Sequence, residues 1–188
     1  MSSPAWAFTL DGHIFYVMND VDGMSLVYDV RTGQWHHWYT GPLRTALWNA
    51  FRGKMWKGRV LFADESTADI WEADPSSMLD EETTHITRVV TGFQAIRGKA
   101  SMRQGSLRVT ASIGNPAQVG AQVTLRFSDD EGRTWGVAYA RTLVAGVYDQ
   151  PLRFRSLGRL REPGRLWEIS DTGGLVTIEG ADADMEGK

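Results

Sequence analysis

The chain has 188 residues, of which 42% are hydrophobic and 23% are charged, and its formal net charge is −3. This composition is that of a globular protein with room for one large or two small domains. The near-neutral balance excludes the strongly basic domain that nucleic-acid binding usually needs, and the absence of cysteine excludes disulfides and thiolate metal sites.

Residues 1–20 lack the basic start and the apolar run of a secretory signal peptide, and no stretch of about 18 apolar residues suggests a membrane span. We therefore expect a protein that is made in the cytoplasm and has no membrane span. Almost every apolar segment alternates with a period of two residues, which is typical of half-buried strands. We expect an all-β protein, with propeller-like antiparallel sheets followed by a β-sandwich-like domain.

Residues 1–73 contain two similar segments, LVYDVRTGQW and VLFADESTADIW. Each has a strand, an aspartate, a turn that contains threonine, and a second strand that carries Trp35 or Trp71. This rhythm is typical of propeller blades, in which hairpins recur and neighbouring sheets pack on each other. At most two blades fit here, so a propeller would have to be completed elsewhere. Only RTALWNAF, residues 44–51, favours a turn or two of helix.

Residues 74–85, DPSSMLDEETTH, have the composition of a surface connection. They contain an aspartate–proline pair, two serines and the acidic triplet Asp80, Glu81 and Glu82. We predict an acidic linker here, and with it a domain boundary. The alternating segments of residues 86–188, such as LRVTASI, QVTLRFS and LRFRSLGRLR, supply about seven strands, which is enough for one β-sandwich.

The segment RFSDDEGRTWG contains one complete Asp-box, the signature S-x-D-x-G-x-T-W. Its residues are Ser128, Asp130, Gly132, Thr134 and Trp135. Asp130 can accept hydrogen bonds from backbone N–H groups of its own turn, and Gly132 permits a positive φ. Thr134 favours the returning strand, and Trp135 covers the hairpin with apolar surface. We therefore interpret the Asp-box as a structural element of the second domain rather than a catalytic one.

An Asp-box alone does not make the chain a glycosidase. Sialidase chemistry needs an arginine cluster, a tyrosine nucleophile with its glutamate and a loop aspartate, and no such constellation can be assigned in a chain too short for a six-bladed domain. The segment GNPAQVG lacks the lysine and the helix of a phosphate-binding loop. Spacing alone does not exclude a serine–histidine–aspartate site, but no nucleophile elbow is present. We expect no catalytic residue, no cofactor and no enzyme activity.

The histidine pair His36-His37 does not indicate a metal site. Adjacent side chains of a strand point to opposite faces, so the two imidazoles cannot hold one ion. His13 and His85 have no ligand-like spacing to this pair. We expect ordinary strand histidines and no bound metal.

Aromatic residues flank the same histidines, in a chain that has eight tryptophans. Trp35, Trp38 and Tyr39 could form a platform for a sugar or a nucleic-acid base. Burial between sheets is the interpretation that we favour, because tryptophan brings a large apolar area to a core.

Arginines recur in LRFRSLGRLREPGR. Four of them fall on one parity, opposite leucine and phenylalanine: Arg153, Arg155, Arg159 and Arg161. A fifth, Arg165, follows after a turn. These side chains either form an ordinary solvated face or pair with a neighbouring subunit or with passing phosphates. We treat the four as a candidate subunit interface. Their obvious counter-charges are Glu131, Glu162 and Glu168.

Five short motifs follow one another through the second half of the chain. They are the strand that enters the Asp-box, a glycine–tyrosine turn, an arginine-rich segment, an aromatic strand and a final acidic stretch. They lie at residues 128–135, 146–148, 153–161, 166–169 and 180–184. Together they resemble the C-terminal part of the tail hub or nozzle proteins of short-tailed bacteriophages, often described as packaged-DNA stabilisation proteins. The upstream VYDVRTGQWHHW is similar to the propeller-like strands of that family.

The resemblance implies a structural protein of the virion tail that is made in the host cytoplasm. Such proteins form rings, typically of six copies, below the portal and the head–tail adaptor, where they extend the DNA channel and retain packaged DNA. We accordingly expect a homo-oligomeric ring with head-to-tail contacts, tail proteins as partners, and DNA that passes without sequence-specific contact. Members of the family are usually much longer. The chain is therefore a C-terminal fragment, a shortened relative, or a subunit whose sheets are completed by assembly.

Two other classes stay open. A carbohydrate-binding or adhesion module of a phage or bacterial surface protein fits the tryptophan content and the Asp-box. A fragment of a glycan hydrolase is the remaining interpretation. A glycan array separates the binding module from the tail protein, since a ring component should bind no glycan reproducibly.

Overall fold

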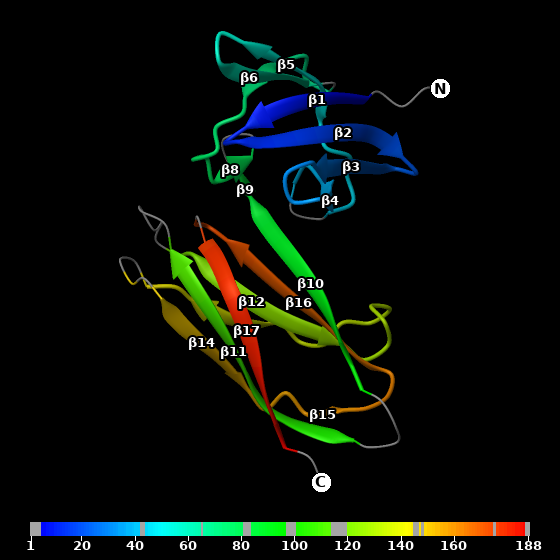
Figure 1. Ribbon diagram of the computed structural model, residues 1–188, viewed down its shortest axis with the longest axis vertical. Helices are drawn as coiled ribbons and strands as arrows, with labels where there is room; N and C mark the ends of the chain where they lie inside the picture. The colour runs from blue at the N-terminus through cyan, green and yellow to red at the C-terminus, as the bar shows by residue number, and fades with distance from the viewer. Residues whose placement is uncertain are drawn as a thin grey trace. The chain divides into compact units, whose positions relative to one another are not determined.

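In the computed structural model, the described residues are 5–41, 44–64, 66–80, 84–96, 101–113, 120–144, 147, 149–174 and 176–186. All regular elements in these ranges are strands, which pair in several sheets (Figure 1). The all-β prediction is therefore confirmed. The helical turns predicted within residues 44–51 are wrong, because this segment is loop as far as Asn49 and strand from Ala50. Since the described ranges hold no helix, they hold none that could cross a membrane.

The chain divides into two compact units, residues 1–84 and 85–188. The acidic linker was predicted over residues 74–85. Within it, β8 (Leu79–Asp80) and β9 (Thr84–His85) form a two-stranded sheet, and Glu81 and Glu82 lie outside the described residues.

The first unit contains a four-stranded sheet and a three-stranded sheet. The first is a meander of β1 (Ala5–Leu10), β2 (His13–Val21), β3 (Met24–Asp29) and β4 (Gln34–Trp38). The second consists of β5 (Ala50–Trp56), β6 (Arg59–Asp64) and β7 (Ile70–Glu72). Asp11-Gly12 and Asp22-Gly23 close the first two hairpins with positive φ at both residues, as two-residue turns between twisted strands require.

The two sheets of the first unit share one core. Alternation along the strands turns Phe8, Val17 and Val27 of the β1–β4 sheet toward Phe62 of the β5–β7 sheet. Trp48, in the connection between the sheets, packs into the same core, with its ring centroid 5.1 Å from that of Phe62. Figure 1 shows β1 beside β5 and β6, the strands against which it packs.

The second unit contains two larger sheets. One has the order β10 (Thr87–Ala95), β16 (Gly164–Thr172), β12 (Gln122–Ser128) and β13 (Tyr139–Thr142), and we call it the β16 sheet. The other is built on β11 (Met102–Ile113), and we call it the β11 sheet. β14 (Gln150–Arg155) and β17 (Val176–Glu186) both pair with the middle of β11 and so lie on its two sides. β15 (Arg159–Leu160) pairs with the start of β11.

The two sheets of the second unit pack face to face, as in a β-sandwich. Val109 of β11 and Phe154 of β14 meet Val123, Leu125 and Trp167 of the β16 sheet in one core. β12 and β14 place their apolar parity inward and their polar parity outward, which is the alternation seen in the sequence.

Glycine at position 53 is a packing requirement of the first unit. A Cβ atom there would overlap the Trp6 ring, whereas a Cβ at Gly92 of β10 would meet open space. We predict that Gly53→Val destabilises the first unit by about 1–3 kcal/mol, because the core must shift to accept the side chain. Gly92→Val, the matched control, should change stability little. Urea unfolding followed by tryptophan fluorescence measures both, and equal effects of the two variants would contradict this packing.

Candidate functional site

The Asp-box forms a closed hydrogen-bonded turn that follows β12. The Ser128 hydroxyl donates to Oδ1 of Asp130 at 2.6 Å, and the Gly132 N–H donates to the Ser128 oxygen at 2.8 Å. The Thr134 N–H and hydroxyl donate to the two carboxylate oxygens of Asp130 at 2.8 and 2.6 Å. Gly132 has a φ of 90°, which a side chain would strain. The polar side chains of Ser128, Asp130 and Thr134 are thus used to hold the turn itself.

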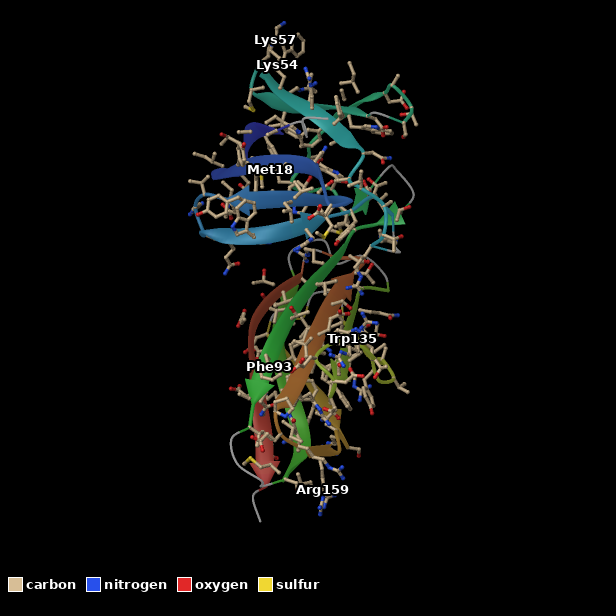
Figure 2. The ribbon with its side chains drawn as sticks, turned by 90° about the vertical axis from the view of Figure 1, so that its right-hand side faces the viewer. Met18, Lys54, Lys57, Phe93, Trp135 and Arg159 are labelled. Atoms are coloured by element: carbon tan, nitrogen blue, oxygen red, sulfur yellow. The ribbon has the colours of Figure 1, made fainter. Side chains whose placement is uncertain are left out.

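Thr134 itself belongs to a bend, and the returning strand β13 begins only at Tyr139. Trp135 lies outside the sandwich core (Figure 2), with the Arg126 guanidinium 4.5 Å from its ring centroid. Arg126 in turn forms a two-point ion pair with Glu168, at 2.7 and 3.0 Å. Trp135 therefore covers a charged pair on the outer face of the β16 sheet.

A second aspartate of the turn makes a contact that the sequence did not indicate. Asp129 binds the guanidinium of Arg165 at two points, at 2.6 and 2.8 Å. Arg165 is only 2% exposed, its guanidinium lies 3.7 Å from the Phe127 ring centroid, and it also donates to the carbonyl of Leu157. Arg165 therefore ties the Asp-box to β16 and to the segment after β14. Nothing in the local sequence distinguishes it from the exposed arginines before it.

The turn also fixes the protonation of Asp130. Hydrogen bonds from the Ser128 hydroxyl and from Thr134 lower the pKa of Asp130 from 3.8 to about 2. These donors favour the ionised form, so the carboxylate and the folded turn stabilise each other.

The candidate interface arginines lie on the outer face of the β11 sheet or at its end. Arg153 and Arg155 alternate on β14 with buried leucine and phenylalanine, Arg159 lies on β15, and Arg161 is exposed just after it. Figure 2 labels Arg159 near the end of this sheet. We call the three strand residues, together with Arg103 and Arg108 of β11, the arginine face.

The register of the β11 sheet places arginines directly opposite one another. Arg153 pairs across the ladder with Arg108, and Arg159 with Arg103. On the far side of β11, Asp182 lies opposite Arg108, and Asp184 opposite Ser106. Among the described residues, no ion pair joins an arginine of this face to a carboxylate. Like charges directly opposite destabilise a sheet and opposite charges stabilise it, so the arginine pairs on one side of β11 are offset in part on the other, where Asp182 lies opposite Arg108 and Glu186 opposite Arg103.

The expected counter-charges do not pair with these arginines within the described ranges. Glu168 is bound by Arg126, and no ion pair connects Glu131 or Glu162 to the arginine face. Arg165, which follows the four arginines in sequence, is buried and bound by Asp129. The arginines of this region therefore belong to two groups, one matched by carboxylates and one unmatched.

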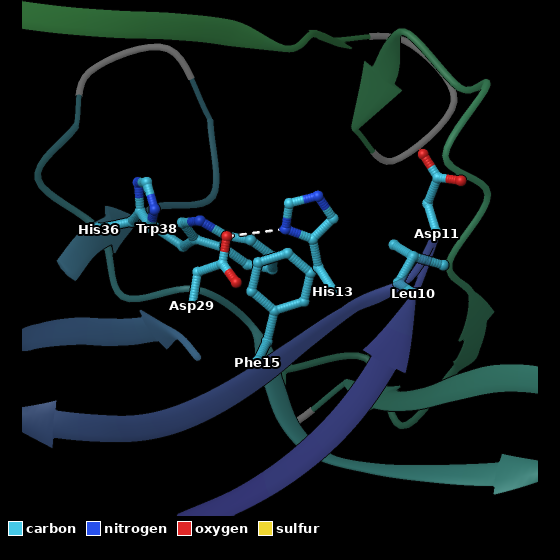
Figure 3. A pocket seen from close by; sticks show the side chains of 7 residues that line it. All are labelled: Leu10, Asp11, His13, Phe15, Asp29, His36 and Trp38. Atoms are coloured by element: carbon cyan, nitrogen blue, oxygen red, sulfur yellow. Dashed lines mark hydrogen bonds and ion pairs between the residues drawn. The ribbon is translucent and has the colours of Figure 1, made fainter. Parts of the chain in front are cut away.

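His13 and His36 line an open pocket of about 300 Å³ beside the β1–β4 sheet (Figure 3). Nδ1 of His13 lies 2.8 Å from Oδ2 of Asp29, which also accepts a hydrogen bond from the Thr32 hydroxyl at 2.9 Å. His37 is on the opposite parity of β4, so the two adjacent histidines point to different faces, as expected. In the described part of the chain, no three histidine, cysteine, aspartate or glutamate residues are grouped to hold a metal ion.

Asp29 acts on its own turn, as Asp130 does. Burial raises the pKa of Asp29, but hydrogen bonds from His13, Thr32 and the Arg31 N–H outweigh it and lower the pKa to about 2. Asp64, the matching residue of the second predicted segment, accepts hydrogen bonds from the Ser66 and Thr67 N–H groups at 2.6 and 3.1 Å. The two similar segments of the sequence are thus two copies of one aspartate-closed turn.

The aromatic run of β4 divides between two environments. Trp38 packs in the core against Trp48, with ring centroids 4.7 Å apart. Trp35 is on the other parity and is 54% exposed, so the expected burial is wrong for this residue within the chain. Its ring lies 4.9 Å from that of Tyr28 on the neighbouring strand.

Comparisons with known proteins add no relative: no protein-family model matches the chain, and no curated protein matches its sequence. Within the motif string noted in the sequence, Gly146 and Tyr148 of the glycine–tyrosine turn lie outside the described residues. The site must therefore be interpreted from its own chemistry. That chemistry consists of aspartate-closed turns and one unmatched arginine face.

The low pKa of Asp130 predicts a pH dependence. Because its folded pKa is below its unfolded pKa, ionised Asp130 contributes stability above about pH 4, and this contribution is lost as the pH falls toward 2. Asp130→Asn should lower the urea midpoint of the second unit at pH 6 and show a smaller further loss than the unaltered chain at pH 3. Parallel pH profiles for the two proteins would contradict this role.

Proposed function

We propose that the chain is a structural component of a phage-tail ring in which copies contact one another head to tail. The observation that carries the proposal is the arginine face. Two cross-strand arginine pairs, Arg108 with Arg153 and Arg103 with Arg159, make no ion pair among the described residues, and the carboxylate residues of β17 lie on the other side of β11. Their mutual repulsion is turned into attraction when a neighbour places carboxylates over them.

A second copy of the chain offers such carboxylates. Asp182 and Asp184 are exposed on β17, across β11 from the arginines of β14, and neither is in an ion pair with a described residue. The β11 sheet therefore carries arginines toward one edge and aspartates at the other. This polarity favours contact between unlike edges, and such a head-to-tail contact closes into a ring when the rotation between copies allows it.

The motif resemblance supports the virion tail as the place of this ring. A ring of this kind, typically of six copies, would lie below the portal and the head–tail adaptor, extend the DNA channel and retain packaged DNA without reading its sequence. The near-neutral charge of the chain agrees with a role that needs no sequence-specific DNA contact. A portal or adaptor gene beside this one would support the proposal, and a neighbourhood of metabolic genes would count against it.

A carbohydrate-binding module is the second candidate, because Tyr28 and Trp35 present neighbouring rings at the surface. Flat aromatic side chains can stack on sugar rings. Reproducible binding on a glycan array, abolished by Trp35→Ala, would favour this candidate over the ring component.

The head-to-tail proposal predicts a charge-sensitive assembly. Arg155→Glu combined with Arg159→Glu should raise the concentration needed for assembly by at least about tenfold, equivalent to about 1.4 kcal/mol, because each change places a carboxylate against those of the neighbour. Assembly of the unaltered chain should also weaken as salt rises. Light scattering across a dilution series measures both effects.

Arg133→Glu is the matched control. Arg133 is exposed on the Asp-box turn, which follows β12 of the β16 sheet, and it is outside the arginine face, so its reversal should leave assembly unchanged. Adding Asp182→Arg and Asp184→Arg to the reversed chain should restore assembly, since the charges of both edges are then exchanged. Equal oligomer mass for the reversed and unaltered chains would contradict the proposal.

A further inference from the structure

The β1–β4 sheet is apolar on both faces. One face carries Phe8, Val17 and Val27 and packs in the core of the first unit. The opposite parity is also apolar, and none of its described side chains has a fixed charge. We call it the aromatic face, and its main residues are Ile14, Tyr16, Met18, Leu26, Tyr28 and Trp35. Met18 is labelled in Figure 2.

The aromatic face is ordered by the register of the sheet. Tyr16, Tyr28 and Trp35 lie directly opposite one another on three neighbouring strands, so their side chains form one row. Tyr16 is 41% exposed and Trp35 is 54% exposed. A contiguous apolar surface of this kind is typical of an interaction site.

The β5–β7 sheet has a second exposed face of different chemistry. Gly53, Val60 and Phe62 point toward the β1–β4 sheet, so the opposite parity points away from it. We call this parity the cationic face, and its residues are Arg52, Lys54, Trp56, Arg59, Leu61, Ala63, Ile70 and Glu72. Glu72 is paired with Arg59 at 3.3 Å, which leaves Arg52 and Lys54 as the cations of the face that are unmatched by described residues. Trp56 is 52% exposed and Ile70 is 71% exposed. Figure 2 labels Lys54 on β5 and Lys57 at the hairpin tip.

The two faces are on opposite sides of the same pair of sheets, because each is turned away from the shared core. We infer that the cationic face of a second copy docks on the aromatic face, so that successive copies continue the sheet-on-sheet packing of the first unit. This inference rests on the proposed ring and names the contact that closes it. The partner is another copy of this chain, and the contact is heterologous.

Two observations favour this partner and this mode. Arg52 and Lys54 of one copy would face Tyr16, Tyr28 and Trp35 of the next, and cations over aromatic rings attract, more strongly when water is excluded. The head-to-tail mode also covers both exposed apolar surfaces. A two-fold contact between aromatic faces would leave Trp56 and Ile70 in water.

The test uses two variants of the full chain. Tyr16→Lys with Trp35→Lys disables the aromatic face by placing cations against those of the neighbour, and Trp56→Ser with Ile70→Ser disables the cationic face by removing its exposed apolar surface. All four side chains are exposed, so circular dichroism should match that of the unaltered chain. By light scattering the unaltered chain should have the mass of a closed ring, and each variant alone the mass of one copy at the same concentration.

Mixing the two variants distinguishes a head-to-tail contact from a two-fold contact. Each retains one working face, so an equimolar mixture should form a complex of two chains and stop there, because one remaining face carries the added lysines, the other keeps Arg52 and Lys54, and the two repel. Tyr16→Phe with Trp35→Phe is the matched control, which keeps the rings and should keep the assembly. If only the aromatic-face variant becomes monomeric and the mixture forms no pair, the contact is two-fold and the inference is wrong.

The remaining outcomes separate this inference from the proposed function. If the variants of both faces keep the full oligomer mass while the Arg155 and Arg159 reversal loses it, the ring stands and this contact is overturned. If the unaltered chain has the mass of a single copy at all concentrations, the proposed ring is wrong. Glycan binding that the aromatic-face variant abolishes would assign the face to a carbohydrate and overturn the inference.

Discussion

A sheet that is apolar on both faces must be covered on both, and this constraint governs the first unit. The β5–β7 sheet and Trp48 cover one face of the β1–β4 sheet, while Tyr16, Tyr28 and Trp35 remain in a row on the other. Exposing that row to water forgoes free energy on the order of 25 cal/mol for each Å² of apolar surface. A partner that covers the row would recover this free energy, and the proposed assembly supplies such a partner.

In the second unit, it is charged side chains that lack partners. Arg165 and Arg126 are each held by a carboxylate at two points, and these pairs lock the Asp-box turn and cover the β16 sheet. The arginine face has no such partner in the described residues and sets like charges across from each other. The contrast lies within one small sandwich, so general arginine content does not explain it. The proposed contact with a neighbouring copy would supply the missing carboxylates.

The sequence predicted what depends on nearby residues. Alternation gave the strands and the inward parity of Leu152 and Phe154, and the hydrogen bonds of Asp130 stay within four residues of it. It did not predict what depends on distant partners. The Arg165–Asp129 pair spans 36 positions, and the exposure of Trp35 follows from which sheet covers which face. The segment before Ala50 has helical spacing, but the core draws Trp48 into an extended connection, so tertiary packing overrides local preference.

The central claim is that this chain is an architectural piece whose exposed sheet faces are completed by its own copies. The most direct test is the native mass of the unaltered full chain, measured by native mass spectrometry over a wide range of concentrations. The account predicts one discrete species that contains a fixed number of copies and persists on dilution, as a closed ring does. A single-chain mass at every concentration, or an open series of masses that lengthens without limit, would contradict it.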